Sequence, residues 1–232
     1  MSLAPLRSPK DAGKRSRTLD SLLAATQTLL LTRSAASLSI ADIAAEAGVV
    51  QGTFYNYFEN LDALLDEVGA VLLVPLAEGL QAIATSCTSP AETFAAKTRQ
   101  ALRIFAQSPG IGRMLFDIGL PVDRFLRQLH HDIKADILDG IATAEFKSAN
   151  PELMTSMICG GITGVALDLH RKRLPISAIE PATAELLRQL GVPPAKATRL
   201  SNTKLAFAAP LHLPLTWHPP VASTTKPKGK RP

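Results

Sequence analysis

The side chains with the clearest chemical pattern in this 232-residue chain lie between residues 51 and 58. Phe54 and Phe58 are four residues apart, so one side of a short helix can anchor both to a core. The residues around them are small, polar or amphipathic, and such a helix offers hydrogen-bond donors and acceptors without bulk. Reading base edges in the major groove of DNA requires such a surface. The candidate contact residues are Gln51, Gly52, Thr53, Tyr55, Asn56 and Tyr57.

Other kinds of chemistry have less support in the sequence. We find no nucleophile beside a base motif, no glycine-rich loop for phosphates and no carboxylate pair placed for catalysis. The two cysteines, Cys87 and Cys159, are too few for a disulfide framework, and no Cys/His spacing indicates a metal cluster. We therefore expect a protein that is not an enzyme and that uses no cofactor and no metal.

Two short helices are expected to position the polar segment. Ser39 is a typical N-cap, and Asp42 then lies in the first helical turn, where the helix dipole favours an anion. Gly48 follows at a position where a left-handed residue ends a helix at low cost. A second helix is predicted from 50 to 57. Ser39 is expected to cap its helix, and the same group or its amide is a further candidate to contact a DNA phosphate.

This stretch closely resembles the helix-turn-helix of the TetR family of transcription regulators. The resemblance implies an N-terminal DNA-binding domain, a larger helical domain that binds a small effector, a homodimer, and a double-stranded DNA operator as partner. It also implies that Tyr55 gives its hydroxyl to a phosphate, while Gln51 and Thr53 lie nearest to base edges or phosphates. The matching residues are Ser39, Ile40, Asp42, Ile43, Ala44, Ala47, Gly48, Val49, Gly52, Thr53, Phe54, Tyr55, Tyr57 and Phe58.

Two departures and the charge distribution count against strong DNA binding. The usual Ser before the recognition helix is Val50 here, and the usual Lys at the start of the next helix is Leu61. Residues 18–66 carry one positive side chain, Arg33, against six carboxylates, which gives a net charge of −5. Residues 1–17 carry five positive side chains and one negative, or +4. We hypothesise that this arm supplies phosphate or minor-groove attraction; the alternative is a tail that only aids solubility.

Apolar residues recur at helical spacing almost throughout, without an alternating strand pattern of useful length. We therefore predict an all-α fold, with a three-helix helix-turn-helix domain followed by a larger helical domain. Both ends of the chain lack this periodicity. The predicted segments are a flexible basic arm (1–17), a DNA-binding domain (18–66), an effector-binding and dimerisation domain (67–205) and a Pro-rich basic tail without fixed structure (206–232).

The larger domain is expected to hold an effector pocket and a dimer interface. Gly160 and Gly164 share one helix face and allow close approach of a second backbone. The alternatives are that the pocket residues only fill the core, and that the glycines only relieve crowding within the subunit. The pocket candidates are Phe94, Leu102, Phe105, Met114, Phe116, Phe125, Leu129, Met154 and Ile158. The interface candidates are Gly160, Gly161, Gly164, Leu167, Leu186 and Leu190.

These expectations combine into a homodimeric transcription regulator, a repressor that a small molecule releases from a palindromic operator. The competing interpretation is a helical protein-interaction or ligand-sensing adaptor with weakened DNA binding. Val50, Leu61 and the net negative charge of residues 18–66 favour it. No apolar run approaches the roughly 20 residues that a membrane span needs, and no secretory signal pattern is found. A soluble, cytoplasmic protein without membrane contact is therefore expected. The sequence specifies no effector, operator or regulated gene.

Overall fold

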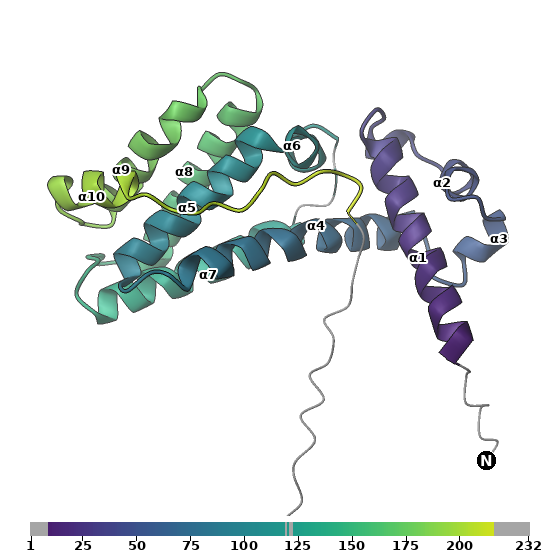
Figure 1. Ribbon diagram of the computed structural model, residues 1–232, viewed down its shortest axis with the longest axis horizontal. Coiled ribbons are helices and arrows are strands. Elements are labelled where there is room, and N and C mark those ends of the chain that lie inside the picture. The colour runs from purple at the N-terminus through teal and green to yellow at the C-terminus, as the bar shows by residue number, and fades with distance from the viewer. Residues whose placement is uncertain (1–8, 119, 121–122, 216–232) are drawn as a thin grey trace, which may run out of the picture.

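A computed structural model describes residues 9–118, 120 and 123–215; the side chains of 9–14 and 123–126 fall outside that description. Within these ranges the chain is helical, without strands. Figure 1 shows a small N-terminal unit at one end and a larger helical body at the other, with α4 running between them. The all-α prediction is confirmed.

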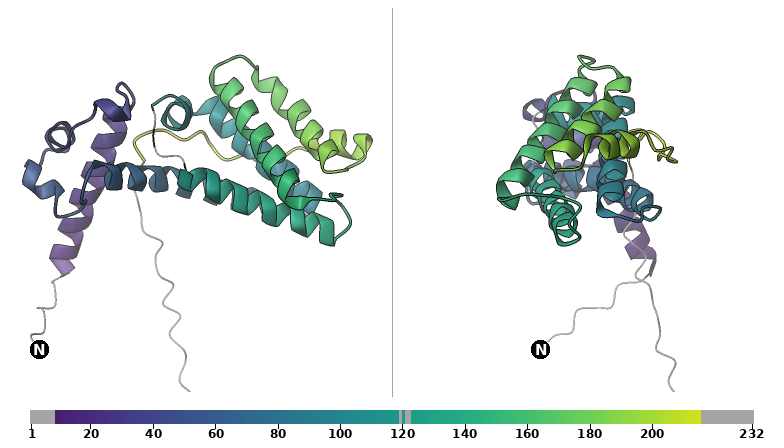
Figure 2. Two further views of the ribbon diagram at one scale, coloured as in Figure 1. Left: turned by 180° about the vertical axis from the view of Figure 1, so that it is seen from behind. Right: turned by 90° about the vertical axis from the view of Figure 1, so that its left-hand side faces the viewer.

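The small unit consists of α1 (Pro9–Leu30), a 3-10 turn (Ala35–Ser37), α2 (Ile40–Glu46) and α3 (Gln51–Phe54). The next helix, α4 (Leu61–Ala84), begins at Asn60, whose side chain accepts a hydrogen bond from the Ala63 amide at 2.9 Å. Leu64 near its start is fully buried. Because α4 continues into the larger body, it contributes to both cores and fixes where they meet (Figure 2).

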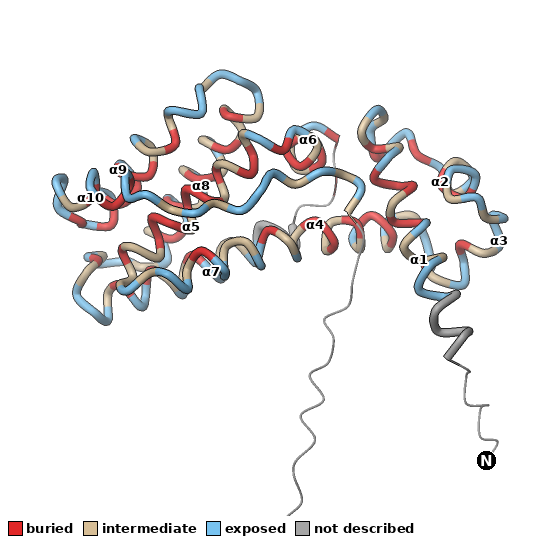
Figure 3. Tube along the Cα trace, viewed as in Figure 1, coloured by how far each residue is buried: buried red, intermediate tan, exposed pale blue. Residues whose placement is uncertain are grey.

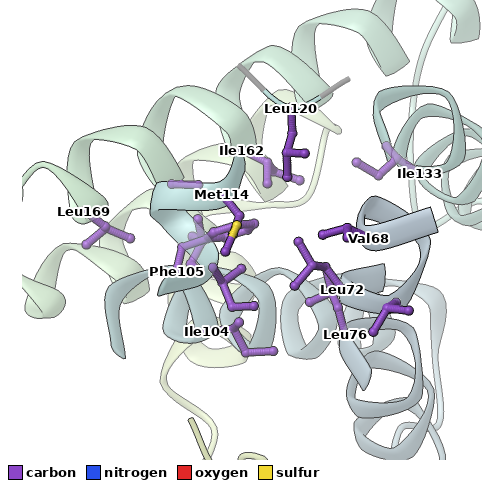
Figure 4. Close-up of a cluster of buried hydrophobic side chains, with 14 of the residues drawn as sticks. Val68, Leu72, Leu76, Ile104, Phe105, Met114, Leu120, Ile133, Ile162 and Leu169 are labelled. Atoms are coloured by element: carbon purple, nitrogen blue, oxygen red, sulfur yellow. The ribbon is translucent and has the colours of Figure 1, made fainter. Parts of the chain in front are cut away.

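In the larger body, α5 lies at the centre and packs against most of the other helices. Figure 4 shows how Val68 and Leu72 of α4, Phe105 of α5, Met114 of α6 and Ile162 of α8 meet in one apolar cluster. Burial of these large side chains holds the helices together. The remaining helices are α5 (Pro90–Gln107), α6 (Pro109–Phe116), α7 (Asp123–Ala142), α8 (Pro151–His170), α9 (Ile179–Gln189) and α10 (Pro194–Asn202), with a 3-10 turn at Ile176–Ala178.

The two ends differ from the sequence-based prediction. The flexible arm predicted for residues 1–17 is wrong from Pro9 onward, because α1 begins there; residues 1–8 lie outside the described residues. The disordered tail predicted from residue 206 is wrong up to residue 215. The residues of this segment are exposed or half-buried where it crosses the body (Figure 3). Hydrogen bonds to buried polar side chains hold it there. Residues 216–232 lie outside the described residues.

By length and composition alone, α8 is the one helix in the described ranges that could cross a membrane. This helix packs on α5, α7 and α9 and also leaves apolar side chains on its outer face. A helix placed between a subunit core and a second subunit has the same composition, so this result is weak evidence for a membrane span.

Candidate functional site

The start of α2 is a capping box centred on Ser39. The Ser39 hydroxyl oxygen accepts a hydrogen bond from the Asp42 amide at 3.1 Å, and an Asp42 carboxylate oxygen accepts one from the Ser39 amide at 3.0 Å. The hydroxyl also donates to that carboxylate at 2.6 Å. Ser39 remains exposed, so the cap fixes the end of the helix that faces solvent. The Ser39 amide and hydroxyl already donate hydrogen bonds to the Asp42 carboxylate. To contact a phosphate oxygen as well, Ser39 has to share one of these donors between the two acceptors.

Arg33 forms its hydrogen bonds within the helix-turn-helix domain. Its guanidinium donates to Asp42 at 3.2 Å and also to the Ser37 carbonyl oxygen. The Ser39 hydroxyl, then Arg33, lower the pKa of Asp42 below its ordinary value by hydrogen bonding to the carboxylate. The single cation of residues 18–66 is therefore occupied with the carboxylate that caps α2.

The turn between α2 and α3 requires a glycine. Gly48 has a φ of +66°, in the left-handed region that side-chain-bearing residues avoid. The following Val50 precedes α3 as its N-cap, makes no side-chain capping bond and is 74% exposed. At the start of the next helix, Leu61 is half-buried and packs on the core. Both departures from the family pattern thus leave an apolar side chain where a polar one is usual.

The α3 region presents polar side chains over a buried aromatic base. Phe54 is 0% exposed and its ring centroid lies 5.6 Å from that of Phe58, so the two aromatics hold the segment to the core. A Cβ added at Gly52 would meet no atom within 4 Å, which leaves its backbone open to close approach. Of the predicted contact residues, Gln51, Gly52, Tyr55 and Asn56 are exposed, whereas Thr53 and Tyr57 are half-buried.

Sequence reasoning missed that α1 places a cation beside this surface. The Arg15 guanidinium lies 5.5 Å from the centroid of the Tyr57 ring and donates to the Asn56 carbonyl oxygen at 3.4 Å. Arg15 is exposed, so its charge reaches the solvent next to the candidate contact residues. The signal was present in the sequence as a basic run, but an arm without structure could not be assigned a position.

A cavity of about 560 Å³ lies between α4, α5, α7 and α8. Its apolar wall includes Ala77 and Leu80 of α4, Ala101 of α5 and Ile162 of α8. The volume falls within the range of small-molecule sites, roughly 300–1,000 Å³. A void of about 30 Å³ adjoins it and shares Leu80, Ala101 and Ile162 with its wall.

Only some of the predicted pocket residues line the cavity or the adjoining void. Phe94 and Leu129 line the cavity, and Phe105, Phe116 and Leu129 line the adjoining void. The pocket prediction is corrected at Leu102, Met114 and Ile158, because all three are 0% exposed and packed in the core away from either wall. Met154 is half-buried outside both walls. The side chain of Phe125 lies outside the described residues.

The polar part of the cavity wall was missed by sequence reasoning. Lys97 of α5 donates to both carboxylate oxygens of Asp136 of α7, at 2.8 and 3.0 Å. Burial raises the pKa of Asp136 above its ordinary value, and hydrogen bonding and charge from Lys97 oppose that rise. Gln128 and Asp132, joined by a 2.8 Å hydrogen bond, lie along the same wall. The cavity thus combines an apolar surface with a paired cation and carboxylate.

The outer face of α8 carries the glycines predicted for the dimer interface. Gly160 and Gly164 are exposed, and a Cβ added at either would meet no atom within 4 Å. Leu153 and Met157, which precede them at helical spacing, are 58% and 54% exposed. Leu153 and Met157 are not among the residues predicted for the interface, although the spacing 153, 157, 160 and 164 marks one helix face.

Other interface candidates point inward. An added Cβ at Gly161 would lie 2.9 Å from Leu186, so this glycine allows α8 to approach α9 within the subunit. The prediction is wrong for Leu186 and Leu190, which are 4% and 0% exposed and have almost no surface to offer a partner. Leu167 is half-buried on α8.

Comparisons with known families identify both parts of the chain. Residues 22–68 match the domain described as "Bacterial regulatory proteins, tetR family". Residues 89–202 match "Tetracyclin repressor-like, C-terminal domain". Together these matches cover well over half of the chain. The chain belongs to the TetR family.

Solved structures agree with this TetR assignment. RolR in complex with resorcinol is 27% identical and has a TM-score of 0.65, with 84% of this chain and 98% of that chain covered. FadR, a fatty acid degradation regulator from Bacillus halodurans, is 18% identical with a TM-score of 0.63, covering 79% and 97%. NalD, a repressor of an efflux pump in Pseudomonas aeruginosa, is 19% identical with a TM-score of 0.61, covering 78% and 98%. The last two show the shared fold. A comparison with curated protein sequences gives no match.

As a member of the TetR family, the chain is a DNA-binding transcription regulator. The helix-turn-helix built from Ser39 to Phe58 lies inside the first family match, and the cavity walls contributed by α5, α7 and α8 lie inside the second. Neither match includes residues 203–215.

Proposed function

We propose that the chain is a homodimeric, non-catalytic repressor that a small molecule releases from a palindromic operator. The observation that carries the proposal is the presence, in one TetR-family chain, of an exposed recognition helix and a cavity of about 560 Å³ between α4, α5, α7 and α8. A ligand that binds the cavity better in one arrangement of the domains shifts the population towards it. If that arrangement misplaces the two recognition helices, operator affinity falls.

The recognition surface proposed for DNA comprises α3, the start of α2 and the adjoining part of α1. Gln51, Thr53 and Tyr55 are the proposed contacts to base edges and phosphates, with Gly52 allowing close approach. Arg15 supplies positive charge beside Asn56 and Tyr57. This charge compensates in part for the acidic remainder of the module. Ser39 has two roles in the proposal, capping α2 and approaching a phosphate.

The proposed effector is a small aromatic molecule with hydroxyl groups. Phe94, Ala101 and Leu129 provide an apolar surface for a ring. A hydroxyl group can donate to Asp136 or accept from Lys97, as these two groups lie in the same wall. RolR, 27% identical over most of its length, is solved with resorcinol, a molecule of this class.

Dimerisation is proposed through the outer face of α8. Leu153, Met157, Gly160 and Gly164 form an exposed apolar strip on which a second α8 can lie closely. A two-fold dimer would place two recognition helices on successive major grooves of a palindrome, one helical turn apart. In this proposal the dimer acts on DNA in the cytoplasm.

The adaptor with weakened DNA binding remains the second candidate, because one observation favours it. Arg33, the only cation of residues 18–66, is held by Asp42 and the Ser37 carbonyl, so this module has no cation of its own to offer a phosphate. Under this hypothesis the chain would bind operator fragments no better than unrelated DNA.

A titration separates the candidates and tests the switch. The full-length protein is mixed with a labelled palindromic fragment from its own promoter, and resorcinol is added as the probe ligand, followed by other hydroxylated benzenes. The repressor proposal predicts operator binding that one member of the series abolishes. It also predicts that this ligand binds the free protein more tightly than the DNA-bound protein. Equal affinity for both forms contradicts the release mechanism, and binding without preference for the palindrome favours the adaptor.

A further inference from the structure

Residues 203–215, here called the strap, form an extended segment that links the two units of the molecule. The strap leaves α10, runs along α5, passes the start of α6 and reaches α1 (Figures 1 and 2). It lies outside both family matches, which cover residues 22–68 and 89–202. The strap therefore lies beyond the part of the chain that the two family models describe.

Polar side chains of α5 fix the first half of the strap. Arg99 donates to the Thr203 carbonyl oxygen at 2.7 Å, and the Ala208 amide donates to the Gln100 side-chain oxygen at 2.8 Å. The Phe207 ring lies under two guanidinium groups, with its centroid 4.3 Å from Arg103 and 5.0 Å from Arg99. Arg99 and Gln100 are buried, so the α5 side of the two hydrogen bonds is sheltered from water, whereas Arg103 and Phe207 are partly exposed.

The far end of the strap is bound by α1 of the DNA-binding unit. The Leu215 amide donates to the Gln27 side-chain oxygen at 2.7 Å, and the Gln27 amide group donates to the Leu215 carbonyl oxygen at 2.8 Å. Gln27 is 0% exposed. A buried amide left without partners is costly, so strap and helix depend on each other. Between the two ends, the Leu211 amide donates to the Ser108 hydroxyl oxygen at 2.9 Å.

The helix that holds the strap also forms a wall of the cavity. Phe94, Lys97, Thr98 and Ala101 line the cavity from one face of α5. Arg99, Gln100 and Arg103, which bind the strap, lie on the opposite face according to helical spacing. A ligand that displaces α5 would therefore pull on the segment that is bonded to α1.

We infer that the strap is a coupling element, which holds the DNA-binding unit in a fixed orientation relative to α5 and transmits ligand-driven movement of α5 to it. The inference rests on the proposed function. The strap acts beside two other links, the 3.0 Å hydrogen bond from Arg113 of α6 to the Leu30 carbonyl and that from the Ala35 amide to the Ile118 carbonyl. Unlike α4, which passes through both units, the strap ties them together by side-chain hydrogen bonds that single substitutions remove.

The test uses two ways of releasing the strap, each with a matched control. Gln27→Met keeps the length of the side chain and removes both bonds to Leu215; Thr28→Met places the same side chain on the exposed neighbouring position. A chain ending at Ala209 lacks the anchored end, whereas a chain ending at Leu215 keeps it and lacks only residues 216–232. Loss of the two hydrogen bonds between Gln27 and Leu215 should lower the operator affinity by about 10-fold.

A second readout does not need DNA or an effector. A spin label is attached to each subunit at Glu46→Cys, after the two native cysteines are removed by Cys87→Ser and Cys159→Ala. The pair of labels reports the distance between the two DNA-binding units of a dimer. We expect a broader distance distribution and about 10-fold weaker operator binding for Gln27→Met and the Ala209 chain. The Thr28→Met and Leu215 chains should behave like the parent. If the parent binds no operator, the proposed function fails while the distance readout still tests the strap.

Parent-like distributions in both strap-release variants would overturn the inference. A loss of operator affinity that is equal for chains ending at Ala209 and Leu215 would also overturn it, because residues 216–232 would then be responsible. If only the Gln27→Met variant fails to fold, the chain ending at Ala209 is used instead. A broader spin-label distance distribution in that chain supports the coupling, and a parent-like distribution refutes it.

Discussion

The DNA-reading module takes its site residues from one contiguous stretch, Ser39 to Phe58, whereas the cavity takes its walls from four helices between Ala77 and Ile162. The first site depends on local rules: a cap at Ser39, a left-handed Gly48 and two aromatics one turn apart. The second depends on how long helices cross. A contiguous site can be recognised in a sequence, but an assembled site becomes visible only when the helices are placed.

Two buried aromatic residues, one from each region, should differ in their effect on operator binding. Phe54→Ala removes the anchor of α3, which is 0% exposed, and should cost roughly 3–5 kcal/mol of folding free energy. Phe94→Ala, at a residue 2% exposed in the cavity wall, should cost a similar amount in unfolding experiments. The functions should separate: operator binding is abolished by Phe54→Ala and retained by Phe94→Ala at temperatures where both are folded. Loss of operator binding in both variants would show that the two regions are not distinct.

The second prediction concerns the outer face of α8. The double variant Leu153→Glu, Met157→Glu would bury two unpaired charges in the proposed interface. The dimer dissociation constant should therefore rise by about 100-fold or more. Ile176→Glu serves as the control, since Ile176 is 44% exposed and lies outside α8, in the 3-10 turn Ile176–Ala178. Sedimentation velocity over a concentration series measures the effect. An unchanged dimer in the double variant would place the interface elsewhere.

The helix-turn-helix and the cavity could be predicted from the sequence to different degrees. The helix-turn-helix was predicted in detail because its caps, turn and aromatic spacing are local. The cavity prediction identified apolar residues but could not separate Phe94, at the wall, from Leu102, in the core, since both have the same helical periodicity. Lys97 and Asp136 are 39 residues apart, and nothing in the sequence indicates that they pair. Gln27 and Leu215 are 188 apart.

The third prediction tests the polar wall of the cavity. Lys97→Met removes the ammonium group that opposes the raised pKa of Asp136, so this pKa should rise further. A hydroxylated ligand that donates to the ionised carboxylate should bind about 10-fold more weakly, and its affinity should fall as the pH drops through the raised pKa. Calorimetric titration with resorcinol at several pH values measures this, with Lys134→Met as a control outside the cavity.

The pH dependence of stability should follow the same shift. Because the folded-state pKa of Asp136 lies above its unfolded value, its contribution to stability is present below the unfolded pKa and is lost as the pH rises through the folded pKa. The melting temperature of the Lys97→Met variant should therefore lie further below that of the parent at neutral pH than at acid pH. A constant difference across this range would contradict the assignment.

The smallest expected effect is at Val50. This residue is the N-cap of α3 without a capping bond, so Val50→Ser should stabilise the start of the helix by about 0.5–1 kcal/mol. The added hydroxyl should also strengthen operator binding slightly. Val74→Ser, an exposed valine in the middle of α4, is the matched control and should not stabilise the protein. A drop in melting temperature for Val50→Ser would show that the valine makes a contribution of its own.

The most direct test of the central claim is the affinity of the full-length protein for a palindromic fragment of its own promoter, compared with a scrambled fragment of equal length, across a range of salt concentrations. A homodimer that reads DNA should bind as two subunits per palindrome and prefer it over the scrambled fragment by about 10³-fold or more. The logarithm of its affinity should fall linearly with the logarithm of the salt concentration. Equal affinity for the two fragments at every salt concentration would contradict the claim that this chain reads DNA.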